Sequence, residues 1–302
     1  MSTVSYTGTP ALTEPVQTLS DGSALVGPHG GLQFHLVWDP SVSSAPAGYK
    51  QAVEAAAGYY SQMFSNDEVI NIDIGWGEVD GMPITPGDLA DGVRPGIYRT
   101  YAQVLSGLDA DAGHSSIQAE ADATLPSTDP LHAKTYYVPY AEAKTLGEIS
   151  ATGTEIDGYI GMSNTVPLDF SQPTASGYFD AVGALEHEIS AVMGRVDAVG
   201  SVDGAGVYTP LDLFRYSAPG VRATSAGAPS PYFSINGGAS NLGYYSTTSD
   251  YADWSYSLVR GDAYGGATSG TTLAMSPNDL IEDAVLGYNF TAAGLAAAKL
   301  TS

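Results

Sequence analysis

The strongest constraint on the fold is a run of alternating residues in the first third of the chain. Residues 70–76 read Ile-Asn-Ile-Asp-Ile-Gly-Trp, so apolar and polar or small side chains alternate at every step. A period of two places successive side chains on opposite faces of a β-strand, and the run therefore predicts a strand with one buried apolar face. Before it, apolar residues between Pro46 and Phe64 recur three or four positions apart, which predicts a helix that packs on a sheet.

Strand and helix patterns interleave along the first two thirds of the chain, and the sequence becomes rich in turn residues after Gly200. This order does not fit a closed barrel, and it predicts an α+β fold: a twisted mixed sheet with packed helices and a loop-rich C-terminal lobe. We expect a flexible lead-in at 1–30, an N-terminal subdomain at 31–200, irregular structure at 109–135, and an irregular C-terminal subdomain at 201–302 that ends in a helix. The expected strands are 32–38, 70–76, 135–138, 156–162 and 232–235, and the expected helices are 46–64, 98–108, 140–146, 179–195 and 276–287.

The charge balance restricts the partners that the chain can bind. Ten Lys and Arg face 33 Asp and Glu, which gives a formal net charge of -23. A surface of this charge repels phosphate backbones and anionic lipids, so we expect no nucleic-acid partner. No apolar run approaches the roughly 18 residues that a transmembrane helix needs, so we expect no membrane span.

Cysteine is absent from the 302 residues, which excludes disulfides, a thiolate nucleophile and cysteine metal ligands. The N-terminal region has no basic segment followed by an apolar stretch, so no cleavable signal peptide is visible. The abundance of Gly, Ser and Thr and the scarcity of Lys are nevertheless typical of extracellular bacterial proteins. We therefore expect a secreted protein without a visible cleavable leader, with a cytosolic protein as the alternative.

The most specific chemical pattern lies in the helix predicted at 179–195. Zinc hydrolases use His-Glu-x-x-His because residues four apart share a helix face, while the Glu takes a proton from metal-bound water. A Gly three residues later lets the chain turn sharply, and a third ligand follows after three more. His187, Glu188, Gly194 and Asp197 stand at the first-ligand, base, turn and third-ligand spacings. Ala191 stands at the second-ligand position, where a methyl group cannot bind a metal.

With these residues, the chain resembles zincin metallopeptidases of the metzincin type. It resembles more closely a family of secreted bacterial metalloproteases that share a His-Glu-Ile-x-x-Val-Met-Gly-Arg helix, over about residues 30–290. The resemblance implies a zinc-dependent endopeptidase that hydrolyses polypeptides through metal-activated water. It implies His187 as the first zinc ligand and Glu188 as the general base. The matching segments are 37–39, 45–60, 70–81, 156–163, 185–195, 210–220, 232–242, 253–254 and 279–288.

Position 191 departs from the family pattern, which has His or Glu there. Three explanations remain: an introduced inactivating substitution, a natural loss of catalysis, or a metal held by other residues. Two protein ligands, His187 and Asp197, are too few for a catalytic zinc, which normally has three, so we expect an inactive or impaired peptidase. The alternative is a non-catalytic extracellular binding or surface protein on a zincin scaffold.

Other charged residues have alternative interpretations. Asp212 is a second candidate for the third ligand, although an Asp before an apolar pair is more often a cap. We interpret Arg195 as a cation that complements the helix C-terminus, with a buried partnership to Asp212 or Asp197 as the alternative. Acidic loops could hold calcium through oxygen ligands. Their acidic residues are Asp250, Asp253 and Asp262.

Overall fold

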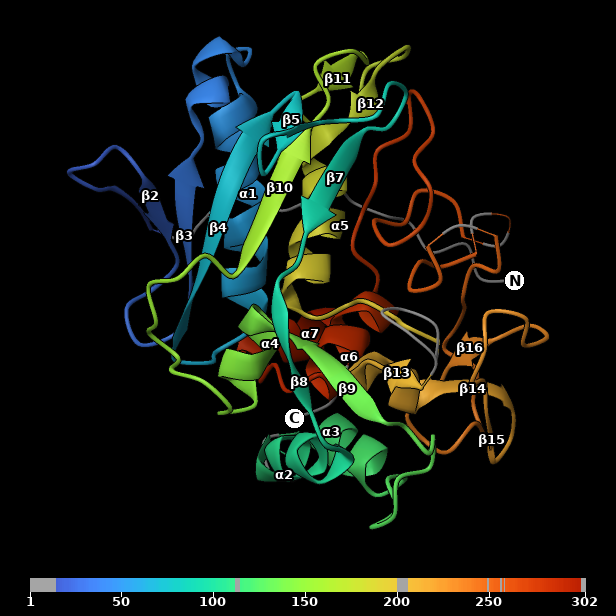
Figure 1. Cartoon of the computed structure of the whole chain (residues 1–302). Helices are drawn as coiled ribbons and strands as arrows, with labels where there is room; N and C mark the ends of the chain where they lie inside the picture. Colours follow the sequence, from blue (N-terminus) through green and yellow to red (C-terminus); the bar gives the residue numbers. More distant parts are fainter. Residues whose placement is uncertain are drawn as a thin grey trace.

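The computed structural model describes residues 15–111, 115–199, 206–248, 250–255, 257 and 259–299. Its main sheet has six strands, and β3, β4 and β10 run parallel to one another at its centre. β1 and β2 extend the sheet antiparallel on one side, and β7 forms the antiparallel edge on the other (Figure 1). The order is β1 (Val16–Thr18), β2 (Ala24–Val26), β3 (Leu32–Trp38), β4 (Glu68–Trp76), β10 (Gly158–Met162) and β7 (Ala90–Val93).

Two helices cover one face of this sheet. In Figure 1, α1 (Tyr49–Met63) and α5 (Ala181–Met193) lie side by side behind the strands. The three isoleucines of β4 are fully buried beneath them, which confirms the alternation read from residues 70–76. The chain is therefore a mixed α+β protein, as expected. Burial of these aliphatic side chains stabilises the fold by about 1.5–3 kcal/mol each.

Two smaller sheets and most of the remaining helices lie below the main sheet in Figure 1. A three-stranded sheet contains β13 (Val207–Tyr208), β9 (Thr135–Pro139) and β8 (Gly96–Arg99), in that order. A four-stranded sheet contains β15 (Val221–Arg222), β14 (Arg215–Ala218), β16 (Tyr232–Phe233) and β17 (Gly243–Tyr244). The other helices are α2 (Tyr101–Asp111), α3 (Ser116–Asp122), α4 (Tyr140–Thr145), α6 (Pro277–Val285) and α7 (Ala292–Ala297). Short elements complete the described chain: η1 (Pro40–Ser44), η2 (Pro210–Phe214), β5 (Glu78–Val79), β6 (Met82–Pro83), β11 (Leu168–Asp169) and β12 (Phe179–Asp180).

Several element boundaries differ from the sequence prediction. The helix predicted at 98–108 begins at Tyr101, because residues 96–99 pair with β9 as strand β8. The helix predicted at 179–195 spans residues 181–193, since 179–180 form β12 and Gly194 ends the helix with a φ of 130°. A positive φ costs little free energy only for a few residue types, above all Gly, and this is why Gly commonly ends a helix in this way.

Regular structure also occurs where irregular chain was predicted. Within the expected lead-in, Ala24 and Val26 are buried on β2, and β1 pairs with β2 although its side chains are exposed. Within 109–135, helix α3 begins after Ser115, whose side chain accepts a hydrogen bond from the Gln118 amide. A helix of one to two turns carries too few apolar positions for its periodicity to be visible in the sequence.

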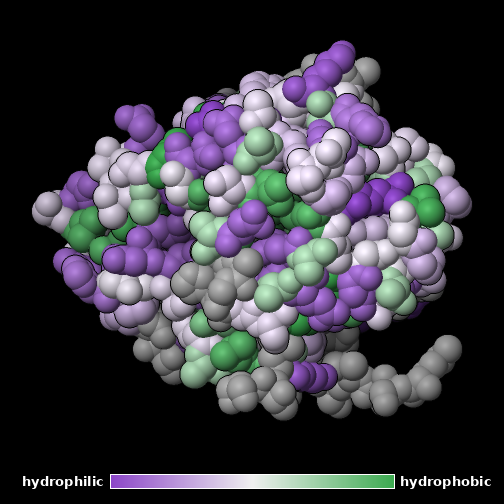
Figure 2. All heavy atoms as spheres, turned by 90° about the horizontal axis from the view of Figure 1, so that it is seen from below, coloured by the Kyte–Doolittle hydropathy of each residue, from purple (hydrophilic) through white to green (hydrophobic). Residues whose placement is uncertain are grey.

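Exposed large apolar side chains are scattered along the described residues. Figure 2 shows the face seen from below, where small apolar areas lie among hydrophilic ones. None of the described helices combines the length and the hydrophobicity that are needed to cross a bilayer. The exposed large apolar side chains come from separate parts of the chain: Val16, Met82, Tyr98, Tyr178, Val221 and Tyr244.

Candidate functional site

Helix α5 carries the predicted site residues, and its ends are fixed by local hydrogen bonds. The Asp180 carboxylate accepts bonds from the amides of Val182 and Gly183, at 3.0 and 3.3 Å, which caps the helix N-terminus. Leu185 and Ile189 are fully buried on the face toward the sheet and α1. With this face anchored in the core, the next residues along the helix surface are directed toward the edge of the sheet.

His187 and Glu188 line one cleft of about 570 Å³ beside the edge of the main sheet. One wall contains Arg94 and the residues of the loop and strand at 87–91, and another contains Asp250 and Asp253. The imidazole and the neighbouring carboxylate therefore face a common solvent-accessible space, as the sequence pattern predicts. Four Asp residues and one Arg share this cleft, so its walls are predominantly acidic.

The two ring nitrogens of His187 have different partners. Nδ1 lies 2.9 Å from the carbonyl oxygen of Ala263, and Nε2 lies 3.2 Å from Oδ1 of Asp253. A carbonyl only accepts, so Nδ1 carries a proton and Nε2 is the nitrogen available to a proton or another cation. Burial and the guanidinium of Arg195 lower the pKa of His187, but the carboxylates of Asp253 and Glu188 outweigh them and raise it above 6.5.

The carboxylate of Glu188 lies against the edge strand β7. Its Oε2 is buried, lies 3.7 Å from Nη2 of Arg94, and has no hydrogen-bond partner among the described residues. A Cβ at Gly92 would lie only 2.8 Å from this oxygen. Glycine at this position of β7 therefore leaves the space that the Glu188 carboxylate occupies.

Arg195 is fully buried at the C-terminal end of α5 and organises the inner wall of the cleft. Its Nη1 donates to Asp253 Oδ1 at 3.1 Å and to the Ala252 carbonyl at 3.2 Å. Its Nε donates to Ser190 Oγ at 2.7 Å, and its Nη2 to the His187 carbonyl at 3.3 Å. Its position after α5 agrees with the predicted interaction with the helix end. Its carboxylate partner is the partly exposed Asp253, however, and neither Asp212 nor Asp197.

Asp253 is the site residue that the sequence reasoning placed only among possible calcium ligands. It contacts both His187 and Arg195, and in the sequence it lies 58 residues beyond Arg195. The charges of His187 and Arg195 outweigh the effect of burial and hold the pKa of Asp253 below 3.8. The Asp253-Trp254 pair is part of the family resemblance, which was the one sequence signal pointing to it.

Asp197 lies in a smaller pocket of about 230 Å³ that adjoins the cleft. Tyr137 and Thr209 also line this pocket, and Arg94 and Asp250 line both spaces. Burial and the nearby carboxylate of Asp212 raise the pKa of Asp197 to about 8. Asp197 therefore lines a pocket beside the cleft, whereas His187 lines the cleft itself.

Asp212 is a buried cap for the surrounding loop. Its carboxylate accepts hydrogen bonds from the amides of Ala198 and Thr209 at 3.1 and 2.9 Å, and it closes a capping box at the start of η2. This arrangement agrees with the structural interpretation of Asp212. Both carboxylate oxygens are already used by backbone donors, since Oδ1 accepts from the Val199 amide at 3.4 Å.

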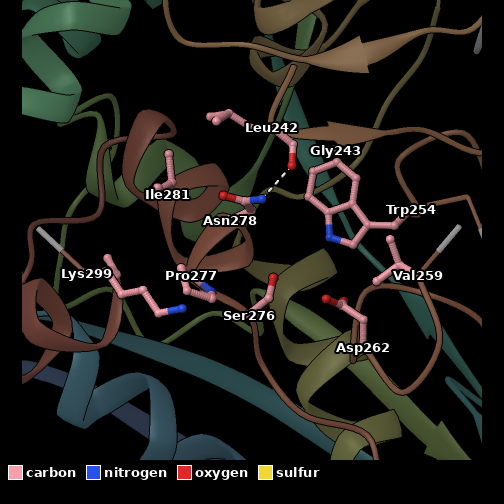
Figure 3. Close-up of a pocket in the computed structure, with 11 residues that line it drawn as sticks. Leu242, Gly243, Trp254, Val259, Asp262, Ser276, Pro277, Asn278, Ile281 and Lys299 are labelled. Atoms are coloured by element: carbon pink, nitrogen blue, oxygen red, sulfur yellow. Dashed lines mark hydrogen bonds between the residues drawn. The ribbon is translucent and has the colours of Figure 1, made fainter. Parts of the chain in front are cut away.

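The three acidic residues considered for calcium do not share one site. Asp250 and Asp253 line the His187 cleft, whereas Asp262 lines a different pocket of about 410 Å³ with Trp254 and Ser276 (Figure 3). Burial and the neighbouring carboxyl of Asp279 raise the pKa of Asp262 to about 8. Calcium binding therefore stays a prediction from composition.

The residues present do not complete a catalytic zinc site. His187 Nε2 and Asp253 Oδ1 are two adjacent atoms of the kind that bind zinc. The buried methyl group of Ala191 adds no third one. Within the described part of the chain, no group of three or more His, Asp and Glu is arranged to hold a metal. Catalytic zinc sites use three protein ligands and an open position.

Scans against known protein families, curated proteins and solved structures find no match for this chain. Its function is therefore inferred from its residues and their geometry.

Proposed function

We propose that this chain is a zincin-type metallopeptidase scaffold, secreted and acting on polypeptides, which alanine at position 191 leaves inactive or severely impaired. The observation that carries the proposal is that one turn of α5 presents His187 and Glu188, in this order, to a single cleft. Zinc would supply polarisation of the peptide carbonyl and activation of water in a complete site. Glu188 is the proposed general base, and His187 the proposed first ligand.

The edge strand β7 supports a polypeptide substrate. It lies at the end of the sheet order and pairs only with β10 among the described strands. An extended peptide can add to such an edge through main-chain hydrogen bonds. The Glu188 carboxylate abuts Gly92 of this strand, so the proposed base lies beside the position that a bound peptide backbone would take.

The proposal predicts that a ligand at position 191 restores metal binding and hydrolysis. We expect Ala191→His and Ala191→Glu to retain one zinc per chain after dialysis. We also expect them to cleave an unfolded fluorescent protein substrate at least about 100-fold faster than the unchanged chain. Ala191→Gln, which matches Glu in size but lacks its charge, is the control, and we expect it to gain little zinc binding and little hydrolysis. Stoichiometric zinc with full proteolysis in the unchanged chain would refute the impairment, and no zinc in either variant would remove the peptidase proposal.

A non-catalytic binding protein on the same scaffold is the second candidate. The observation that favours it is the hydrogen-bonded series of His187, Asp253 and Arg195, in which each side chain already has a partner without a metal. The cleft also has a volume of about 570 Å³ in this chain. A protein with this site could bind a peptide in the cleft without cleaving it.

Glu188→Gln distinguishes the two candidates. In an Ala191→His or Ala191→Glu background that binds zinc, removing the general base should lower the rate of hydrolysis by about 10²–10⁴-fold while zinc stays bound. The measurements are turnover of the fluorescent substrate and metal content of the same preparation. Unchanged turnover in the Gln variant would show that Glu188 is not the base, and a binding protein would be indifferent to the substitution.

A further inference from the structure

We propose that the cleft beside β7 binds the basic side chain, Lys or Arg, of an extended polypeptide. This inference rests on the proposed function for the polypeptide nature of the ligand, and it names the class of substrate. The space is the cleft of about 570 Å³ that His187 and Glu188 line. Pockets for small ligands have volumes of roughly 300–1,000 Å³, so the cleft is large enough for one long side chain.

The first support is the charge of the cleft, which five carboxylates and one guanidinium line. The carboxylates belong to Asp88, Asp91, Glu188, Asp250 and Asp253. Arg195 neutralises Asp253 from inside the protein, at 3.1 Å. Four carboxylates and the guanidinium of Arg94 remain, which is a net of three negative charges (four minus one), or two when His187 is protonated. A concave surface of this charge attracts cations and repels anions.

The second support is the environment of the Glu188 carboxylate. This residue is only 8% exposed, and no described residue donates a hydrogen bond to its Oε2. The Nη2 of Arg94 lies 3.7 Å from Oε2, beyond hydrogen-bond distance, while its Nη1 donates to the Gly92 carbonyl at 2.7 Å. A buried carboxylate without a hydrogen-bond donor costs free energy. A cationic group bound in the cleft would offset that cost.

The third support is the apolar part of the lining. Six small or aliphatic side chains contribute to the walls: Leu89, Ala90, Ala184, Ala263, Ala267 and Leu273. Lys and Arg place their methylene groups against apolar surface and keep the charged end group in polar surroundings. The combination of apolar walls and carboxylates therefore fits a long basic side chain better than a compact ion. Within the described part of the chain, no group of three or more His, Asp and Glu is arranged to hold a metal.

Strand β7 provides a way to hold the rest of the peptide. Among the described strands it pairs only with β10, so its other edge can form main-chain hydrogen bonds with an extended peptide. Successive side chains of a paired strand point to opposite faces of the sheet. Every second side chain of the peptide would then lie on the face that carries α5 and the cleft. We therefore expect the preference for a basic residue at one such position.

The experiment measures the binding of fluorescein-labelled peptides to the full, unchanged chain by fluorescence anisotropy. Three peptides of about twelve Gly, Ser and Ala residues carry, at alternate central positions, two Arg, two citrulline or two Glu residues. Citrulline has the shape of arginine without its charge. We expect the Arg peptide to bind at least about 10-fold more tightly than the citrulline peptide, and the Glu peptide to show no binding.

Variants separate the cleft from the net charge of -23, which attracts any cationic peptide. Glu188→Gln should raise the Kd for the Arg peptide at least about 10-fold, and Asp91→Asn, at an exposed position, about 3-fold. Arg94→Gln should lower this Kd about 3-fold, because it removes the cation that competes with the peptide. Damage to the fold would not tighten binding. Asp67→Asn removes the same formal charge outside the cleft and should leave the Kd within about twofold.

The outcomes separate this inference from the proposed function. Equal affinity for the Arg and citrulline peptides, or equal losses with Glu188→Gln and Asp67→Asn, would overturn the inference. Displacement of the Arg peptide by millimolar Ca²⁺ at constant ionic strength would assign the cleft to a metal ion and overturn it as well. The proposed function would survive these results, since zinc content and hydrolysis in the position-191 variants test it.

Tight binding of the Arg peptide without hydrolysis in the position-191 variants would support the inference and count against the peptidase. Far-ultraviolet circular dichroism checks that each variant is folded. If Glu188→Gln does not fold, the two other cleft variants decide: an unchanged Kd in both Asp91→Asn and Arg94→Gln overturns the inference.

Discussion

Arg195→Ala is expected to lower the free energy of unfolding by about 3–5 kcal/mol, because it removes a fully buried cation and leaves the groups paired with it uncompensated. The guanidinium is fully buried and donates to Asp253, to Ser190 and to the carbonyls of Ala252 and His187. It also lies 4.2 Å from the centre of the Tyr264 ring. Its loss would leave several buried acceptors without a donor. Urea denaturation followed by tryptophan fluorescence measures the change.

Arg99→Ala is the matched control for this prediction. Arg99 forms an ion pair with Glu148 at 2.6 Å, but the two side chains keep 21% and 18% of their surfaces exposed. Ion pairs in which both partners reach solvent contribute at most about 1 kcal/mol, so this variant should lower the free energy of unfolding only slightly. Arg195→Lys should lower the free energy of unfolding by an amount between those of Arg195→Ala and Arg99→Ala. Lysine keeps the charge but cannot reproduce the planar fork of hydrogen-bond donors. Equal effects of Arg195→Ala and Arg99→Ala would show that the buried network does not stabilise the fold.

The features that were predictable from the sequence are those encoded by local periodicity. Residues 70–76 and the apolar face of α5 follow from spacing along a strand and a helix, and both are buried as expected. The pair His187 and Glu188 could be placed on a common side of a cleft for the same reason. His187 is the one residue of α5 that is not buried, and Glu188 beside it lines the same cleft.

The partners of these residues were not predictable, because they come from distant segments. Asp253 and Ala263 contact His187 from 66 and 76 residues away in the sequence (253 minus 187, and 263 minus 187). No spacing rule connects a helix with a loop of the C-terminal region. Strand β8 was missed because its pairing with β9 joins residues about 40 positions apart, and such tertiary pairing overrides the helical pattern of 98–108. Asp197 matched a motif, but the direction of the chain after Gly194 depends on contacts that a motif does not contain.

Stability is expected to fall as the pH rises from 5 to 8, because α6 buries carboxyl groups in the core. Asp279, Glu282 and Asp283 are all fully buried on this helix. Burial raises the pKa of Asp283 to about 7, although the Tyr264 hydroxyl, which donates at 2.7 Å, and the charge of Arg195 oppose the rise. The pKa of Asp279 is raised to about 7 as well, again chiefly by burial. These acids are therefore protonated in the folded protein at mildly acidic pH.

The sign of the effect follows from the proton balance of Asp283. Its pKa of about 7 in the folded protein exceeds the value near 3.8 in the unfolded chain. The stabilisation that its proton gives the folded state is therefore complete below pH 3.8 and is lost as the pH rises through 7. Between pH 5 and 8 this one group should remove about 2–3 kcal/mol from the free energy of unfolding. Asp283→Asn, which cannot ionise, should flatten the pH dependence by that amount and be more stable than the unchanged chain at pH 8. Urea denaturation at pH 5, 6, 7 and 8 measures how the free energy of unfolding depends on pH in the unchanged chain and in the Asp283→Asn variant.

An exposed carboxyl provides the comparison that isolates burial from the net charge of -23, which by itself also weakens the fold at high pH. Asp67 is exposed in the turn before β4, so Asp67→Asn removes the same formal charge without removing a buried acid. If general repulsion dominates, both Asn variants will flatten the pH dependence equally. If burial on α6 dominates, as the structure leads us to expect, only Asp283→Asn will do so. A slope for Asp283→Asn indistinguishable from that of the unchanged chain would mean that this carboxyl is ionised in the folded protein throughout the range.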